Sequence, residues 1–339
     1  MWRKLLFFGL FLMICNTGNS FPLCIYGVDE PQSVPYVKKA GFNCFHTYRK
    51  APELLAPLAQ KAQKHKMQVV FYPDDLIGST YEEQARQWPV LAWYLVDEPD
   101  VWRWTRERVQ AAHNRAKNAF PDTPTTLVIG QGKTATPFYD LSDILMVDWY
   151  PVPHLALQSF GDNVRFAKEG QDKYGAADRP LWGVVQIFDW KAFKQHRPDN
   201  DRIGRFPTQE EIRFMSYDGI VNGADGLFYF IFTAKDGIMP KTQPDWWKRV
   251  KNVTRELARL RPVLEKGTLI ENPVRTDAPL AVQTRLYKNH RYTILVNRSD
   301  KSVAAPEAFL TKAYKPLFGT KKTPQLAPYA VWVLKSKNK

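Results

Sequence analysis

The chain has 339 residues, of which 44% are hydrophobic and 14% aromatic, and its net charge is +14 at neutral pH. This length suits one large domain and a small one, and the apolar content is ample for a sizeable core. Three cysteines and six dispersed histidines offer no spacing typical of a metal site. A metal-dependent deacetylase or phosphodiesterase needs clustered His and Asp ligands, so it is a weak alternative, and we expect no metal or cofactor.

The first twenty residues have the pattern of a secretion signal. Arg3 and Lys4 precede an apolar run over residues 5–15, and small residues follow at positions 18–20. The run is too short to span a bilayer comfortably. We therefore predict a signal peptide over residues 1–20, cleaved after Ser20, and an exported protein, periplasmic or extracellular, with no transmembrane segment once the signal is removed.

Cys24 and Cys44 remain after the predicted cleavage. An exported protein lies where disulfides persist, and the two residues fall on the first and second predicted strands, so they can be in contact. A bridge between them would stabilise the fold by roughly 3 kcal/mol through loop closure. Two buried free thiols are the alternative, which the sequence favours slightly.

The positive charge is concentrated in the C-terminal segment. Residues 268–339 hold thirteen basic and four acidic residues, a net charge of +9, which leaves +3 for residues 21–267 once Arg3 and Lys4 are removed with the signal. Such a segment fits an anionic glycan as partner, although a solvated basic face is the simpler explanation. We expect no nucleic-acid partner, and the sequence does not indicate an oligomeric state.

Apolar runs alternate with helical patterns between residues 21 and 267. The runs are continuous rather than alternating, which is typical of strands buried on both faces. Eight strand–helix units in this length predict a (β/α)₈ barrel, an α/β fold. An open doubly wound sheet is the alternative, but no Gly-rich phosphate turn follows the first strand. The predicted strands are 23–27, 43–48, 68–72, 90–96, 125–129, 143–147, 181–185 and 226–232.

The pattern changes after Gly267. Short strand-like runs over residues 280–287, 292–297 and 329–335 are separated by turn signals such as Asn289-His290. Residues 268–339 therefore predict a small antiparallel, β-sandwich-like domain.

The fourth strand ends in Asp97-Glu98-Pro99, where the proline stops the ladder. In a (β/α)₈ barrel the chemistry lies at the carboxyl ends of the strands. Acids and aromatic residues gather there, and this combination is typical of glycosidic bond cleavage, which uses two carboxyl groups and flat rings that hold sugars. The candidates besides Asp97 and Glu98 are Asp148, Tyr150, Gln186, His46, Tyr48, Tyr72, Trp190, Tyr229 and Gln131.

This arrangement resembles the (β/α)₈-barrel glycoside hydrolases, and most nearly the large clan A whose general acid is the Glu of an Asn-Glu-Pro motif on strand four. The resemblance implies that Glu98 is the acid, with Asp97 where the clan has Asn, and that Tyr150 matches the clan's aromatic residue on strand six. The clan's nucleophile is a Glu on strand seven, and this chain has Gln186 there. An amide cannot be that nucleophile.

Three positions are candidates for the second carboxylate. Asp148 fits an inverting mechanism if it lies about 6.5–9.5 Å from Glu98. The adjacent Asp97 and Glu98 resemble hexosaminidases in which the substrate's acetamido group is the nucleophile, the Asp orients it and Tyr150 helps to hold its oxygen. Both acids reach one site only if the strand has ended at Asp97, because neighbours on a strand point to opposite faces. Asp189 is the third candidate.

These residues predict an exported glycoside hydrolase that cleaves O-glycosidic bonds of a polysaccharide or oligosaccharide, with Glu98 as general acid and a carbohydrate as its partner. The alternative is a non-catalytic glycan-binding protein on a degenerate barrel, for which Gln186 is the main support.

Overall fold

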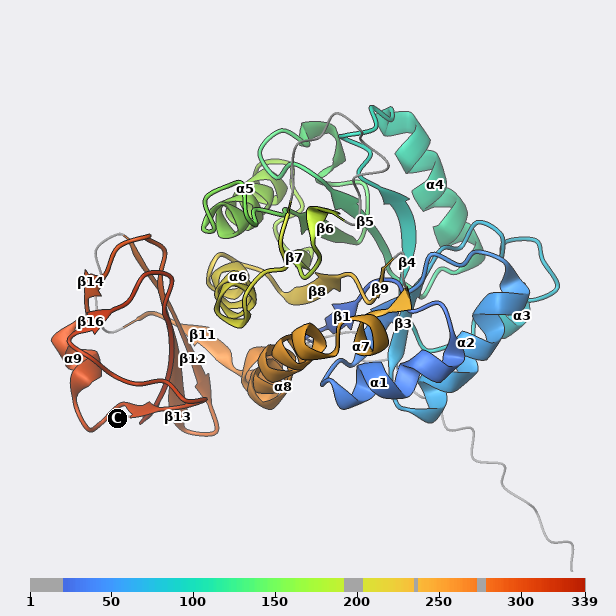
Figure 1. Ribbon diagram of the computed structural model, residues 1–339. Coiled ribbons are helices and arrows are strands. Elements are labelled where there is room, and N and C mark those ends of the chain that lie inside the picture. The colour runs from blue at the N-terminus through green and yellow to red at the C-terminus, as the bar shows by residue number, and fades with distance from the viewer. Residues whose placement is uncertain (1–20, 192–203, 235–236, 273–278, 339) are drawn as a thin grey trace, which may run out of the picture.

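The computed structural model describes residues 21–191, 204–234, 237–272 and 279–338. The predicted signal peptide lies outside these residues. Eight parallel strands form a closed barrel in chain order, which confirms the predicted fold (Figure 1). The strands are β1 Leu23–Ile25, β2 Cys44–His46, β3 Gln68–Phe71, β4 Val90–Asp97, β5 Thr125–Ile129, β6 Ile144–Asp148, β7 Leu181–Gln186 and β8 Gly226–Phe230.

Helices of very different length connect the strands. Thr105 caps α4 by accepting a hydrogen bond from the Arg108 N–H, and Thr208 forms a capping box with Glu211 at the start of α6. The β5–β6 connection has a single 3₁₀ turn, η2, in place of the full helix that eight regular units imply. The helices are η1 Pro31–Ser33, α1 Val34–Lys39, α2 Pro52–Lys64, α3 Glu82–Ala85, α4 Arg106–Ala119, η2 Thr136–Phe138, α5 Ser159–Lys173, α6 Gln209–Val221, α7 Met239–Thr242 and α8 Pro244–Lys266.

The barrel strands are apolar on both faces because each face is covered. Inward-facing side chains such as Val70, Tyr94, Met146 and Phe228 form one cluster. Outward-facing side chains pack under the helices in a second, larger cluster. This double burial explains why the strands read as continuous apolar runs.

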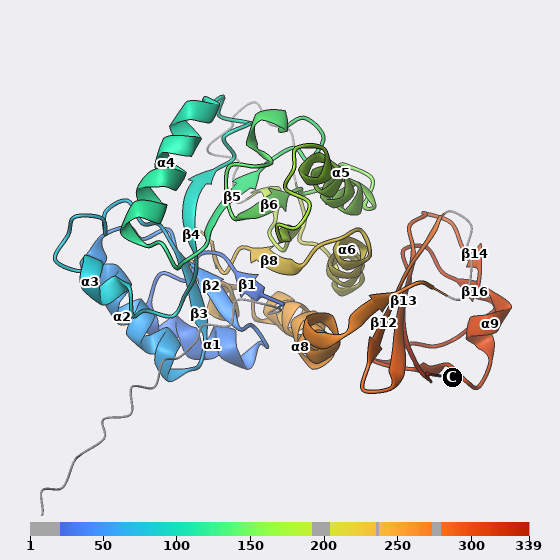
Figure 2. The same cartoon turned by 180° about the vertical axis from the view of Figure 1, so that it is seen from behind.

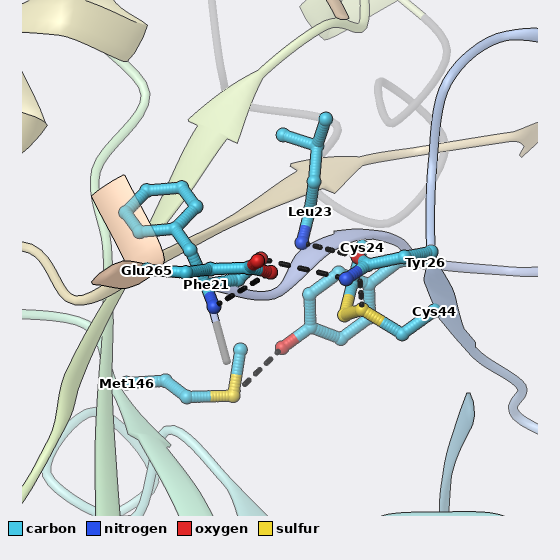
Figure 3. Close-up of a disulfide and its surroundings, with 8 residues drawn as sticks. Phe21, Leu23, Cys24, Tyr26, Cys44, Met146 and Glu265 are labelled. Atoms are coloured by element: carbon cyan, nitrogen blue, oxygen red, sulfur yellow. Dashed lines mark hydrogen bonds between the residues drawn. A yellow bond between two sulfur atoms is a disulfide. The ribbon is translucent and has the colours of Figure 1, made fainter. Parts of the chain in front are cut away.

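Cys24 and Cys44 form a disulfide inside the barrel. The two residues face each other in the parallel register of β1 and β2, with Cα atoms 4.5 Å apart, and both are fully buried. The expectation of free thiols is therefore wrong: the register brings the two inward-facing thiols together. Figure 3 shows the bridge beside the ring of Tyr26.

The C-terminal residues form a small antiparallel domain, as predicted. Its main sheet has the order β11-β12-β13-β17-β15, and β14 pairs with β16. Phe309, Leu326 and Trp332 are buried between these two layers. The elements are β11 Thr268–Ile270, β12 Leu280–Tyr287, β13 His290–Asn297, β14 Val303–Ala304, α9 Glu307–Leu310, β15 Lys315–Pro316, β16 Gln325–Leu326 and β17 Val331–Lys337, and a hairpin of β9 Thr233–Ala234 and β10 Gly237–Ile238 follows the barrel.

The C-terminal sheet lies beside α6 and α8, on one side of the barrel (Figures 1 and 2). The Arg298 guanidinium joins the two domains: it lies 2.6 Å from Asp218 on α6 and 3.0 Å from Asp162 on α5. Burial raises the pKa of Asp218 to about 6, although the charge of Arg298 opposes this rise. Arg298 also donates to the carbonyl of Gln158, just before α5, and the Tyr329 hydroxyl donates to the Gln158 side chain.

Candidate active site

A bulge at the end of β4 brings Tyr94 and Asp97 together. Tyr94 pairs with Thr126 and Asp97 with Val128, so three steps along β4 match two along β5. Residues three apart on a regular strand point to opposite faces of the sheet. The extra residue of the bulge lets Tyr94 and Asp97 point to the same face. The Tyr94 hydroxyl donates a hydrogen bond of 2.6 Å to Oδ1 of Asp97. The bulge thus turns the Asp97 carboxylate toward the inward-facing ring of Tyr94.

Glu98 follows with a backbone φ of +43°, a left-handed conformation that is uncommon for a residue with a side chain. Its N–H donates to the Val128 carbonyl, and its carbonyl accepts from Val101 and Trp102. The strand ends at Asp97, which meets the condition for both acids to reach one site. The Glu98 carboxylate lies against Gly130, since a Cβ added there would be 3.1 Å from its Oε1.

Asp148 ends β6 and is 7% exposed. Burial raises the pKa of Asp148 well above its usual range, and the charges of Glu98 and Asp97 raise it further. Hydrogen bonding to Glu98 raises its pKa and hydrogen bonding to Tyr150 lowers it, while its Oδ1 has no hydrogen-bond partner among the described residues. A carboxylate close to a second acid favours the protonated form of that acid. Glu98 and Asp148 therefore titrate as an interacting pair, in which Asp148 is the group with the raised pKa.

Asp97 differs from Asp148 in its access to solvent. Asp97 is in contact with solvent, but many protein atoms lie around its carboxylate. This partial burial raises the pKa of Asp97, and the hydrogen bond from Tyr94 lowers it. Of the three acids, Asp97 is the one that an approaching molecule meets first.

Four tyrosines surround His46, and one of them, Tyr94, contacts Asp97. The ring centroids of Tyr26, Tyr48, Tyr72 and Tyr94 lie 4.6, 4.7, 5.5 and 4.7 Å from that of His46. Burial lowers the pKa of His46 to about 3, so its ring is neutral at physiological pH. Among the described residues neither ring nitrogen has a hydrogen-bond partner. His46 therefore acts as an uncharged ring within this tyrosine cluster.

A second aromatic group stands beside Asp148. Tyr150 lies 5.0 Å from Phe188, 6.1 Å from Trp190 and 5.6 Å from Phe230, measured between ring centroids. Tyr26 links this aromatic wall to the tyrosine cluster, 5.6 Å from Phe230. Aromatic rings thus flank the three acids on both sides, an arrangement that suits the flat faces of sugars.

Gln186 is fully buried, and its amide is used within the protein. Its Oε1 accepts from the Val152 N–H at 2.8 Å, and its Nε2 donates to the carbonyls of Val152 and Phe188 at 2.9 and 3.3 Å. The residue that replaces the strand-seven carboxylate therefore fastens the loop after β6.

Three further sequence candidates bond to residues other than the acids. Tyr229 is buried on the outer side of β8, and its hydroxyl bonds to Ser216 of α6 at 2.8 Å. Gln131 is exposed after β5, where its side chain accepts from Thr134. Asp189 accepts from the Lys191 N–H in the loop after Trp190. The structure thus brings together Asp97, Glu98, Asp148, Tyr150, Trp190, His46, Tyr48 and Tyr72.

Sequence reasoning missed several residues of this site. Tyr26 and Tyr94 were read only as strand residues, although each precedes a run of strand-end acids by three positions. Asp100 holds the acid loop by accepting from the N–H groups of Gly130 and Gln131 at 3.0 and 2.9 Å. The spacing of Tyr94 from Asp97 signals contact only if the bulge is known.

The described residues hold no group of three His, Cys, Asp or Glu side chains arranged for a metal ion. Within the same part of the chain, no helix combines the length and the apolar character required to cross a membrane.

Comparison with known proteins gives matches in structure alone. No family model matches the chain, and no curated protein matches it in sequence. An α-amylase from Geobacillus thermoleovorans, solved with acarbose, superposes with a TM-score of 0.57 at 11% identity over 94% of this chain and 98% of its own. Amy13B of Eubacterium rectale gives a TM-score of 0.60 at 10% identity, over 95% and 96%.

A third match belongs to another class of enzyme. A GH30 endoxylanase from Clostridium papyrosolvens has a TM-score of 0.53 at 12% identity, covering 94% of this chain and 96% of its own. The chain has a glycoside hydrolase-like (β/α)₈ fold. At these identities the likeness concerns the fold, because a fold by itself does not determine the chemistry of its site.

Proposed function

We propose that the protein is an exported glycoside hydrolase in which Glu98 is the general acid. The contact between Glu98 and Asp148 carries this proposal. Asp148, buried and with a raised pKa, favours the presence of a proton on the pair at neutral pH. A general acid needs a proton at the working pH, and we infer that Glu98 receives this proton from Asp148 through their contact.

The same contact argues for Asp97 as the second carboxylate. An inverting pair needs about 6.5–9.5 Å between its carboxyl groups, and a retaining pair about 5–5.5 Å. Groups in hydrogen-bond contact meet neither requirement, so the inverting role for Asp148 loses its support. Asp97 is open to solvent and oriented by Tyr94, which suits a group that acts on the substrate directly.

We therefore favour a substrate-assisted mechanism on a 2-acetamido sugar. The acetamido oxygen attacks the anomeric carbon while the bond to the leaving oxygen breaks and that oxygen takes the proton of Glu98. Asp97 orients the acetamido N–H, and Tyr150 holds its carbonyl. Water then opens the cyclic intermediate, giving a proton to the Glu98 carboxylate, which restores the acid.

Gln186 no longer favours the non-catalytic alternative. Its amide is bonded to the loop after β6, so its identity reflects a structural task rather than the loss of a nucleophile. Measuring binding and hydrolysis separately distinguishes a hydrolase from a glycan-binding protein.

Export is part of the same proposal. The Cys24–Cys44 disulfide is typical of exported proteins. Cleavage after Ser20 would make Phe21 the first residue, and its backbone nitrogen already donates to Oε1 of Glu265 at 3.3 Å (Figure 3). A free α-amino group there would form an ion pair with Glu265.

Product analysis tests the proposed function. The protein is incubated with soluble chitin oligomers, peptidoglycan fragments, xylan and starch, and new reducing ends are measured by chromatography and mass spectrometry. We expect cleavage only of the glycans that carry 2-acetamido sugars. Binding to any of them without new reducing ends would favour the glycan-binding alternative.

A further inference from the structure

A cavity of about 590 Å³ lies at the opposite end of the barrel from the acids. The amino ends of six strands line it, from Gln68 on β3 to Asp225 before β8. The end of α8 and Arg285 of β12 close its side, so both domains contribute to the wall. Its volume is in the usual range for small-molecule sites. Asp225 and Lys266 are exposed, which shows that solvent enters.

Four cationic side chains line this basal cavity: Lys168, Arg179, Lys266 and Arg285. Carbonyl oxygens are the partners of three of them. Lys168 donates to Ala177, and Arg179 to Asp140 and Ser142. Arg285 donates through Nη1 to Leu264 and Gly267 and through Nε to the side-chain oxygen of Gln283, so within the part of the chain that the structure describes its Nη2 remains for a ligand. None of the four belongs to an ion pair among the described residues. Carbonyl dipoles orient a cation without cancelling its charge.

The carboxylates of the cavity do not balance this charge. Glu265 is already paired with Arg261, 3.1 Å away, and also accepts from Phe21. Asp225 accepts from the Leu181 N–H; partial burial raises its pKa, while this hydrogen bond and the charges of Lys168 and Arg285 lower it. Asp178 is the third carboxylate of the wall. Burial lowers the pKa of Arg285, and the charge of Asp225 opposes this fall. Four cations thus face three carboxylates, one of which is already paired with Arg261.

We propose that the basal cavity binds a sugar-sized organic oxyanion through a phosphate or carboxylate group. Guanidinium groups recognise both groups with paired hydrogen bonds, and Lys266 adds an exposed ammonium at the rim. The basic C-terminal domain, with its charge of +9, increases the local concentration of such anions. This site is separate from the barrel mouth, so it does not depend on the proposed hydrolase activity.

Titration calorimetry with two probes tests this site, with sodium chloride added to keep the ionic strength constant. Inorganic phosphate and glucuronate report on the two possible anionic groups, and saturation by one of them alone identifies the group. We expect saturable binding by the wild type. Lys266→Met and Arg285→Met should each weaken it by at least about tenfold, the cost of a lost charge-assisted contact.

The matched control is Lys288→Met, which removes an exposed cation from the next turn of the same domain, outside the cavity. It should bind the probe like the wild type. Lys266→Met keeps the test decisive if the Arg285 variant fails to fold, because Lys266 is exposed. The proposal is overturned if the wild type shows no saturable binding, or if Lys266→Met and Lys288→Met have equal effects.

Discussion

Glu98→Gln should lower the rate of glycan hydrolysis by roughly 10²–10⁴-fold, the usual contribution of a general acid. The amide keeps the size of the side chain and can still bond to Asp148, but it has no proton to give to the leaving oxygen. The folded protein should retain its thermal stability and its affinity for the oligosaccharide. Initial rates and calorimetric binding on the same chitin oligomer measure both effects.

A substrate whose leaving group needs no proton tests the role of Glu98 as a proton donor more specifically. A dinitrophenyl glycoside releases a stable anion that needs no protonation, so Glu98→Gln should lose far less activity on it than on the oligomer. Glu30→Gln is the matched control, since Glu30 follows β1 on the same face of the barrel and pairs with Arg49 on the surface. Equal losses on both substrates would argue against a proton-donating role.

Asp97→Asn should reduce hydrolysis of acetamido glycans by about 10²-fold or more, comparable with the loss of an oriented electrostatic group. The neutral amide would accept a weaker hydrogen bond from the acetamido N–H and would no longer stabilise the positive charge that develops on the cyclic intermediate. Asp75→Asn, an exposed change at the end of β3, serves as control. The kcat values of the two variants on one N-acetylglucosamine oligomer give the comparison.

Tyr94→Phe removes the hydrogen bond to Asp97 but keeps the Asp97 carboxylate. The Tyr94 hydroxyl stabilises the ionised carboxylate and so holds its pKa down. Removing the hydroxyl raises the pKa of Asp97, and the acidic limb of the pH–rate profile should move to higher pH. An unchanged limb in Tyr94→Phe, together with full activity in Asp97→Asn, would remove Asp97 from the mechanism.

The barrel was predictable because its strands are buried on both faces and stand out as continuous apolar runs. The runs over residues 68–72 and 125–129 match β3 and β5 closely. The disulfide was predicted less well, since strand assignments do not give the register, and the register sets Cys24 opposite Cys44. The short η2 turn in place of a regular helix was likewise not visible in the apolar pattern.

The strand-end acids were predictable from the topology, because parallel strands deliver their carboxyl ends to one face. The positions of these acids relative to one another were not predictable from the topology. The β4 bulge that turns Asp97 toward Tyr94 comes from pairing with β5, which no local pattern records. Gln186 shows the same limit: its position suggested a substrate ligand, while its partner Val152 lies 34 residues away in the sequence.

A crystal structure of Glu98→Gln with a bound chitin oligosaccharide would show whether position 98 acts on the glycosidic bond. We expect a sugar ring over the tyrosine cluster, with a glycosidic oxygen about 3 Å from the residue 98 amide and the acetamido group on Asp97. An oligosaccharide bound only on the barrel floor or on the C-terminal sheet, with position 98 unoccupied, would contradict this expectation.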